Sequence, residues 1–191
     1  MKKPNSKNIK SIIKIYGFNL SKIDMTGVIV SDCDLRKIKF RKDRNLFQKI
    51  DGKNLSGTKL PCRDYTRHNF KDVLLKNTCF PEGAKLPKGR NFFQKIRRRD
   101  ISYSIMPCLD YSIYNLKNVC IKGTVFPENC VLPKEYDFFR KLKFRDIRNT
   151  ILPKDTVENL HFYDLRDVKC DLSKYNLSAN QLFIIYKKQE N

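Results

Sequence analysis

Bulky hydrophobic residues recur at every fifth position near the start of the chain. The stretch FNLSKIDMTGVIVSDCDLRKIKF, residues 18–40, places them at Leu20, Met25, Val30, Leu35 and Phe40. An α-helix repeats every 3.6 residues and a strand every 2, so neither element explains a period of five. The pattern predicts a chain that turns a corner after each group of five residues.

A second repeat of 46 residues organises the rest of the chain. Its copies begin with NLFQKI at Asn45, NFFQKI at Asn91 and DFFRKL at Asp137, which gives units 45–90, 91–136 and 137–182. The opening stretch is a truncated earlier copy. Inside the units the period of five continues through bulky residues at Leu55, Leu60, Tyr65, Phe70, Leu75 and Phe80, at Ile101, Met106, Tyr111, Leu116, Ile121 and Phe126, and at Ile147, Leu152, Val157 and Phe162. The period of five is broken at Asp167, which is not a bulky hydrophobic residue, and it resumes at Leu172.

A small or apolar residue commonly stands two positions before each bulky one, with Asp or Asn between them. Thr58, Val73 and Thr78 are examples. A corner-turning group of five would place the bulky and the small residue inside a narrow shaft. Four of these small positions hold residues that fit poorly, and their turns should be widened, distorted or shifted: Arg63, His68, Tyr114 and Asp155.

This pattern resembles the pentapeptide-repeat family, whose groups of five read roughly A(D/N)LXX, over residues 18–182. The resemblance implies an all-β fold, a right-handed quadrilateral β-helix (solenoid) in which four groups of five make one coil. Residues 15–182 would form this single domain. Residues 1–14 would be a basic N-terminal cap, and residues 183–191 a C-terminal cap closed by Phe183, Ile184, Ile185 and Tyr186. In this family such a cap is often a dimer interface, so a homodimer is a possible assembly.

Two segments interrupt the groups of five, PEGAKLPKGRNFFQKI and PENCVLPKEYDFFRKL. Each contains two prolines, which cannot all lie in a hydrogen-bonded ladder. We therefore expect a loop and a short helical turn that bulge on one side, recurring every 46 residues. Asn91 and Asp137 are the expected N-caps of these turns.

The charge balance is strongly basic. The 191 residues include 40 Lys and Arg against 20 Asp and Glu, a net charge of +20, which attracts polyanions and anionic surfaces. A genome rich in A and T would also enrich Lys, and both explanations stay open. The seven cysteines form no CxxC pair and indicate reduced thiols. No segment approaches a membrane span, so the sequence predicts a cytoplasmic protein, although a secreted effector would look the same.

Candidate catalytic residues are few. His68 and His161 do not occupy equivalent positions in their units. Cys62 and Cys108 do, but the third unit has Lys154 there, which leaves any metal or nucleophile site incomplete. There is no Gly-rich phosphate loop. The sequence therefore predicts a protein that is not an enzyme and has no metal or cofactor.

Basic residues return with the repeat. If each unit holds two coils and a loop, equivalent residues lie above one another at roughly 10 Å and form a track for phosphates on one face. The residues predicted to bind nucleic acid in this way are Lys49, Lys95 and Lys141, Lys53, Arg99 and Arg145, and the neighbouring Arg97, Arg98 and Lys143.

Three functions fit these observations. The best-described activity of the resembled family is imitation of duplex DNA, which needs an acidic surface and disagrees with a charge of +20. The first hypothesis is a basic face that engages nucleic acid, or a complex containing it, without reading sequence. The second is a scaffold or inhibitor, such as a bacterial effector or mobile-element protein, that blocks a partner enzyme through an acidic patch. The third is a self-associating structural rod.

Overall fold

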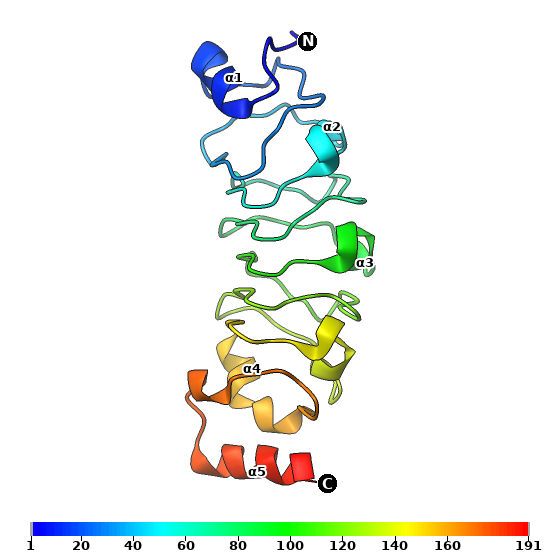
Figure 1. Ribbon diagram of the computed structural model, residues 1–191, viewed down its shortest axis with the longest axis vertical. Coiled ribbons are helices and arrows are strands. Elements are labelled where there is room, and N and C mark those ends of the chain that lie inside the picture. The colour runs from blue at the N-terminus through cyan, green and yellow to red at the C-terminus, as the bar shows by residue number, and fades with distance from the viewer. Residues whose placement is uncertain (1, 191) are drawn as a thin grey trace.

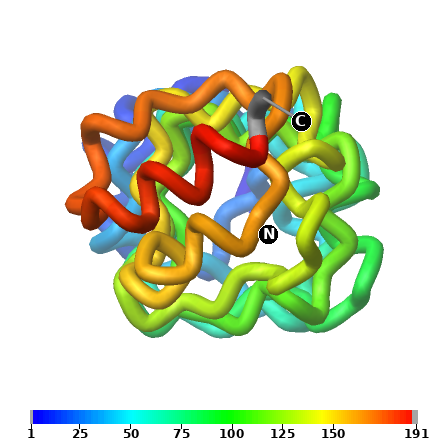
Figure 2. The backbone as a smooth tube through the Cα atoms, turned by 90° about the horizontal axis from the view of Figure 1, so that it is seen from below, coloured from blue at the N-terminus to red at the C-terminus, as the bar shows by residue number. Residues whose placement is uncertain are grey.

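The computed structural model describes residues 2–190, and they form a column of stacked turns of the chain (Figure 1). The two ends of the chain lie at opposite ends of the column. Seen along the axis, successive turns superimpose around a common interior (Figure 2). The column is the frame on which every side chain discussed below is placed.

Parallel bridges between single residues show how the turns stack. Lys59 pairs with Cys79 and Ile105 with Val125, each 20 residues apart, whereas Cys79 pairs with Ile105 and Val125 with Ile151, each 26 apart. Each 46-residue unit therefore contributes one turn of 20 residues and one of 26. The longer turn carries the helical insertion.

The expectation of an all-β fold, and with it the quadrilateral β-helix and solenoid assignment, is wrong. Within residues 2–190 there is no extended strand and no sheet, only isolated bridges alongside helical turns. The reason is the short distance between corners. Corner residues such as Asp32, Asp72 and Asn77 have left-handed backbone, with φ of 55°, 58° and 56°. Only one residue between two corners forms a bridge to the next turn. The consecutive pairs of bridged residues that define a strand are therefore absent.

The interior is filled as the period of five predicts in the first two long units. Every predicted bulky position from Leu55 to Phe80 and from Ile101 to Phe126 is at most 3% exposed. The small positions Val73 and Val119 are fully buried. This combination of one large and one small side chain at each corner fills the shaft without overpacking it.

Buried hydroxyl groups in small positions form a column of their own. Each donates to a backbone carbonyl of a preceding turn, at oxygen–oxygen distances of 2.7 to 3.0 Å. These donors are Thr58, Thr78, Ser104, Thr124 and Thr150. A buried hydroxyl is tolerated only when it is hydrogen-bonded, so these bonds explain why polar residues occur inside the shaft.

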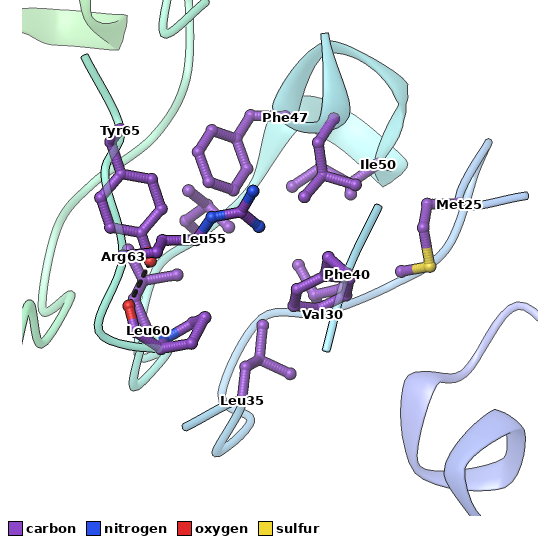
Figure 3. Close-up of a pocket in the computed structure, with 12 residues that line it drawn as sticks. Met25, Val30, Leu35, Phe40, Phe47, Ile50, Leu55, Leu60, Arg63 and Tyr65 are labelled. Atoms are coloured by element: carbon purple, nitrogen blue, oxygen red, sulfur yellow. Dashed lines mark hydrogen bonds between the residues drawn. The ribbon is translucent and has the colours of Figure 1, made fainter. Parts of the chain in front are cut away.

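Arg63 shows how one unsuitable residue is accommodated. Its guanidinium points toward a small cavity of about 10 Å³ between the truncated copy and the first long unit (Figure 3). Phe47 and Val30 line the same cavity, and the guanidinium carbon lies 5.8 Å from the centre of the Tyr65 ring. A small gap in the interior packing therefore accommodates the side chain.

The third unit departs from the predicted register. A helix, α4 (Lys154–Glu158), and a 3-10 turn, η5 (Leu160–Phe162), replace the expected groups of five. The prediction that Phe162 faces inward is wrong, because it is 61% exposed, and Tyr163 is buried instead. Asp155, which cannot be buried without a partner, lies on the exposed side of α4. Its expected distortion of the shaft is confirmed.

Short helical turns recur on one side of the column (Figure 1). They are α2 (Leu46–Lys49), α3 (Phe92–Lys95) and η3 (Phe139–Lys141), followed by η1 (Asp51–Lys53), η2 (Arg97–Arg99) and η4 (Lys143–Arg145). The predicted bulge is confirmed. The predicted side-chain cap by Asn91 is wrong, since Asn91 makes no capping hydrogen bond. Asp137 instead pairs with Lys141 at 2.7 Å.

Helices cover both ends of the column. At the N-terminal end, α1 (Ile9–Tyr16) buries Ile9 and Ile12. At the other end, η6 (Leu172–Lys174) is followed by α5 (Ala179–Glu190), which lies across the last turns (Figure 2). Of the four predicted cap residues only Ile185 is buried, and the expectation that Phe183 and Tyr186 close the end is wrong because both are more than half exposed. No helix within residues 2–190 is long and apolar enough to cross a membrane.

The hydroxyl column generates a prediction about stability. Thr78→Val keeps the shape of the side chain but removes the hydrogen bond to the Leu55 carbonyl, so the free energy of unfolding should fall by about 1 kcal/mol. Ser21→Ala, which removes a hydroxyl that donates a surface hydrogen bond to Asn19, is the control and should change it by less than about 0.5 kcal/mol. Urea unfolding measures both, and equal effects would contradict a structural role for the buried bond.

Candidate nucleic-acid interface

The three lysines at 46-residue spacing occupy equivalent places in the structure. They end α2 and α3 and the turn η3, which follow one another down the same side of the column (Figure 1). The backbone carbonyl of each accepts a hydrogen bond from the preceding turn, and the pairs are Lys49 with Gly27, Lys95 with Asp72 and Lys141 with Asn118. The backbone therefore fixes where each lysine side chain begins.

The residue before each lysine fixes the helical turn to the next layer. The side-chain amide of Gln48 donates to two carbonyls at 3.1 and 2.9 Å, and that of Gln94 donates to two at 2.9 and 2.8 Å. In the third unit Arg140 takes this place and binds the buried carboxylate of Asp164 at 2.9 Å. Hydrogen bonds from Arg166 and Arg140 hold the pKa of Asp164 far below its usual range.

Two of the predicted binding residues serve the backbone instead. Arg97 donates to the Gly52 carbonyl at 2.8 Å, and Lys143, its equivalent, donates to the Arg98 carbonyl at 3.2 Å. Each contact joins residues 45 positions apart and so spans one whole unit. Arg97 also donates to the Asp72 carbonyl at 3.1 Å. These two side chains tie neighbouring units together.

Three more of the predicted residues are paired with acids. Lys49 lies 2.7 Å from Asp43, and Arg145 lies 3.1 Å from Asp167. Lys141 is held by two carboxylates at 2.6 and 2.7 Å, which raise its pKa. Their charges are largely neutralised, so they contribute little to a field that attracts phosphates.

The remaining predicted residues form no ion pair within residues 2–190, and they are Lys53, Lys95, Arg98 and Arg99. Arg98 and Arg99 are exposed and have left-handed backbone, with φ of 59° and 50°. The position of Arg98 is held by Gly52 in the first unit, where the same backbone conformation carries no steric cost. The second unit thus presents two cations on a strained turn.

A cleft of about 600 Å³ lies beside Lys95. Arg44, Arg67 and Lys71 line it together with Lys95, and no carboxylate does. A second hollow of about 430 Å³ shares Arg44 and Arg67 with this cleft and adds Lys42, Arg63 and Asp64. The sequence pattern did not single out Arg67 or Lys71, which the fold brings to Lys95 from a turn more than 20 residues earlier.

His68 lies at the wall of this cleft. Its ring is 5.4 Å from the rings of both Phe47 and Tyr65, and its two nitrogens are buried without a hydrogen-bond partner. Burial, and then the nearby charge of Arg63, lower the pKa of His68 to about 4. The imidazole is therefore neutral at pH 7 and acts as an aromatic packing residue.

Histidine, cysteine and carboxylate side chains are the residues of this chain that could ligate a metal ion or act as nucleophiles. Within residues 2–190 no group of three His, Cys, Asp or Glu side chains is arranged to hold a metal ion. The seven cysteines are free thiols, and burial raises the pKa of Cys33, Cys120, Cys130 and Cys170.

Comparison with protein-family models, curated proteins and solved structures found no match. The resemblance to pentapeptide-repeat proteins therefore remains a prediction from the residue pattern. The function has to be argued from the geometry of the chain itself.

The contacts of the basic residues predict which of them stabilise the fold. Arg97→Met should lower the free energy of unfolding by about 1 kcal/mol, because two backbone carbonyls lose a charged donor. Lys95→Met removes the same charge without breaking an ion pair and should change it by less than about 0.5 kcal/mol. Chemical unfolding of both variants would contradict this assignment if Lys95→Met were the more destabilising.

His68 predicts a pH dependence of stability. An unfolded His takes up a proton as the pH falls through 6.5, whereas the folded His68 does so only near pH 4, so its contribution to stability is lost as the pH falls through this window. His68→Tyr, which copies the equivalent Tyr114, should weaken that loss. Urea unfolding at pH 6.5 and at pH 4 measures it, and an unchanged difference between the two pH values would show that His68 is not the group responsible.

Proposed function

We propose that this chain is a non-enzymatic binding protein whose basic side holds nucleic acid without reading its sequence. The observation that carries the proposal is the acid-free cleft beside Lys95, lined by four cations that form no ion pair within residues 2–190. Phosphate oxygens are the abundant partners for such a surface, and release of their counterions supplies affinity.

The arrangement of the column supports contact with a polymer. Equivalent residues of successive units recur at two turns, roughly 10 Å along the axis. A duplex presents one phosphate charge per roughly 1.7 Å of its axis. Several phosphates therefore face each unit in any register, as binding without sequence preference requires. The short helical turns place Lys53, Lys95, Arg98 and Arg99 along this side (Figure 1).

The turn after each short helix presents further side chains to this side. Its backbone is left-handed in all three units, at Gly52 and Lys53, at Arg98 and Arg99, and at Phe144 and Arg145, so the conformation belongs to the fold. In the second unit both residues of this turn are exposed arginines, which adds two cations close to α3. A protein that binds nucleic acid would act in a compartment that holds it, such as the cytoplasm.

The proposal predicts a specific loss of binding. A triple variant with Lys53, Lys95 and Arg99 changed to Glu should bind random-sequence duplex about tenfold more weakly, because three unpaired cations are replaced by anions. The slope of log affinity against log salt should also fall by as much as about 3. Fluorescence anisotropy titrations at several salt concentrations measure both quantities.

The matched control changes Lys7, Lys10 and Lys14 to Glu. These exposed residues lie on and before α1, away from the side that carries α2 and α3 (Figure 1), and the change in net charge is the same. Binding by this control should stay within about threefold of the original protein. The proposal is wrong if the unchanged protein does not bind duplex, if its binding is insensitive to salt, or if both variants lose binding equally.

A further inference from the structure

Two of the three recurring lysines are neutralised in the same way. Lys49 pairs with Asp43 at 2.7 Å, and Asp43 stands six residues before it. Lys141 pairs with Glu135 at 2.6 Å, again six residues before it. The two ion pairs occupy equivalent places 92 residues apart in the sequence. An acid six residues before the lysine is thus a recurring part of this side of the column.

The middle copy lacks this acid. The residue six before Lys95 is Gly89. The other acid that binds Lys141, Asp137 at 2.7 Å, corresponds to Asn91 in the middle copy. Both carboxylates are therefore missing at once, and Lys95 forms no ion pair within residues 2–190.

The space beside the lysine is largest where the acids are missing. Beside Lys49 only about 10 Å³ is open, and beside Lys141 about 310 Å³. The cleft beside Lys95 is the largest of the three at about 600 Å³. The cleft is open at the surface and is large enough to receive a phosphate group. The missing acid thus coincides with an open cleft.

The charges around Lys95 complete the site. Arg44, Arg67 and Lys71 line the cleft with it, whereas in the next copy Arg67 is replaced by Ile113. Four cations then line one open cleft with no carboxylate among the lining residues. Two of them are guanidinium groups, which bind the oxygens of a phosphate in a forked geometry. A bound anion would relieve their mutual repulsion.

We infer that this cleft binds a phosphate group, which takes the place that the Glu135 carboxylate occupies beside Lys141 in the next copy. The inference rests on the proposed function, because it names the phosphate site that nucleic acid would use. A free phosphorylated molecule offers the same chemistry. The protein therefore has one open phosphate site and an equivalent site that is closed by its own side chain.

The test fills and opens these sites by exchanging residues between copies. Gly89→Glu supplies the missing acid, and Gly89→Gln is its neutral control of the same size. A Cβ atom at Gly89 would meet no atom within 4 Å, so both variants fit the fold. Glu135→Gly combined with Asp137→Asn removes both acids from the closed site and copies the residues of the middle unit. The probe is inorganic tripolyphosphate, titrated into the whole protein at low salt by calorimetry, with thermal unfolding as a check of folding.

The original protein should bind tripolyphosphate, and Gly89→Glu should weaken this binding about tenfold while Gly89→Gln stays within about threefold. The double variant Glu135→Gly and Asp137→Asn should strengthen total binding of the probe. The inference is overturned if the original protein does not bind the probe, or if Gly89→Glu binds it as well as Gly89→Gln does.

A second titration with duplex DNA that carries no terminal phosphates separates the two sources of phosphate. If Gly89→Glu weakens both probes, the site serves nucleic acid. If it weakens tripolyphosphate while the duplex binds equally or does not bind at all, the site belongs to a free phosphorylated molecule. In that case the inference stands, whereas complete absence of duplex binding removes the proposed function, as would insensitivity of that binding to salt or an equal loss in the two triple variants.

Discussion

The backbone hydrogen bonds between neighbouring turns are the constraint on which the rest of the structure depends. The amide of Leu55 donates to the Leu74 carbonyl at 3.0 Å, and the amide of Leu74 donates back to Lys53 at 3.0 Å. Bonds of this kind fix the turns in register, so the interior admits one large and one small side chain at each corner. The same register places the helical turn of every second layer on one side of the column. The cations of these turns are therefore aligned along that side.

The residues that fill the interior of this column could be predicted from the sequence, but the fold class could not. Residues such as Tyr65 and Tyr111 were correctly predicted to face inward because the shaft imposes its spacing on the chain. The all-β assignment failed because a period of five places a corner after every bridging residue, which prevents strands. In the third unit Asp155 stands at a small position, and α4 and the exposed Phe162 are found where the groups of five were expected.

The candidate site could be predicted in part. The 46-residue period places Lys49, Lys95 and Lys141 in equivalent positions, and the structure shows their carbonyls in equivalent bonds. Spacing alone could not show that Arg97 bonds to a carbonyl of the preceding unit, because this depends on the height of the turns. The exchange of Glu135 for Gly89 was visible in the sequence, yet its meaning required the ion pair that the structure shows.

Hydrogen bonds in this column are local: the backbone bonds join neighbouring turns, and even the long side-chain bonds of Arg97 and Lys143 span a single unit of two turns. Cooperativity is then a property of adjacent turns, as in a one-dimensional chain of coupled elements. Local opening or proteolytic trimming at the irregular C-terminal end, from α4 to α5, would shorten the column layer by layer. The cleft beside Lys95 is built from earlier turns and would keep its geometry, so the proposed binding site and the irregular C-terminal end are physically separate.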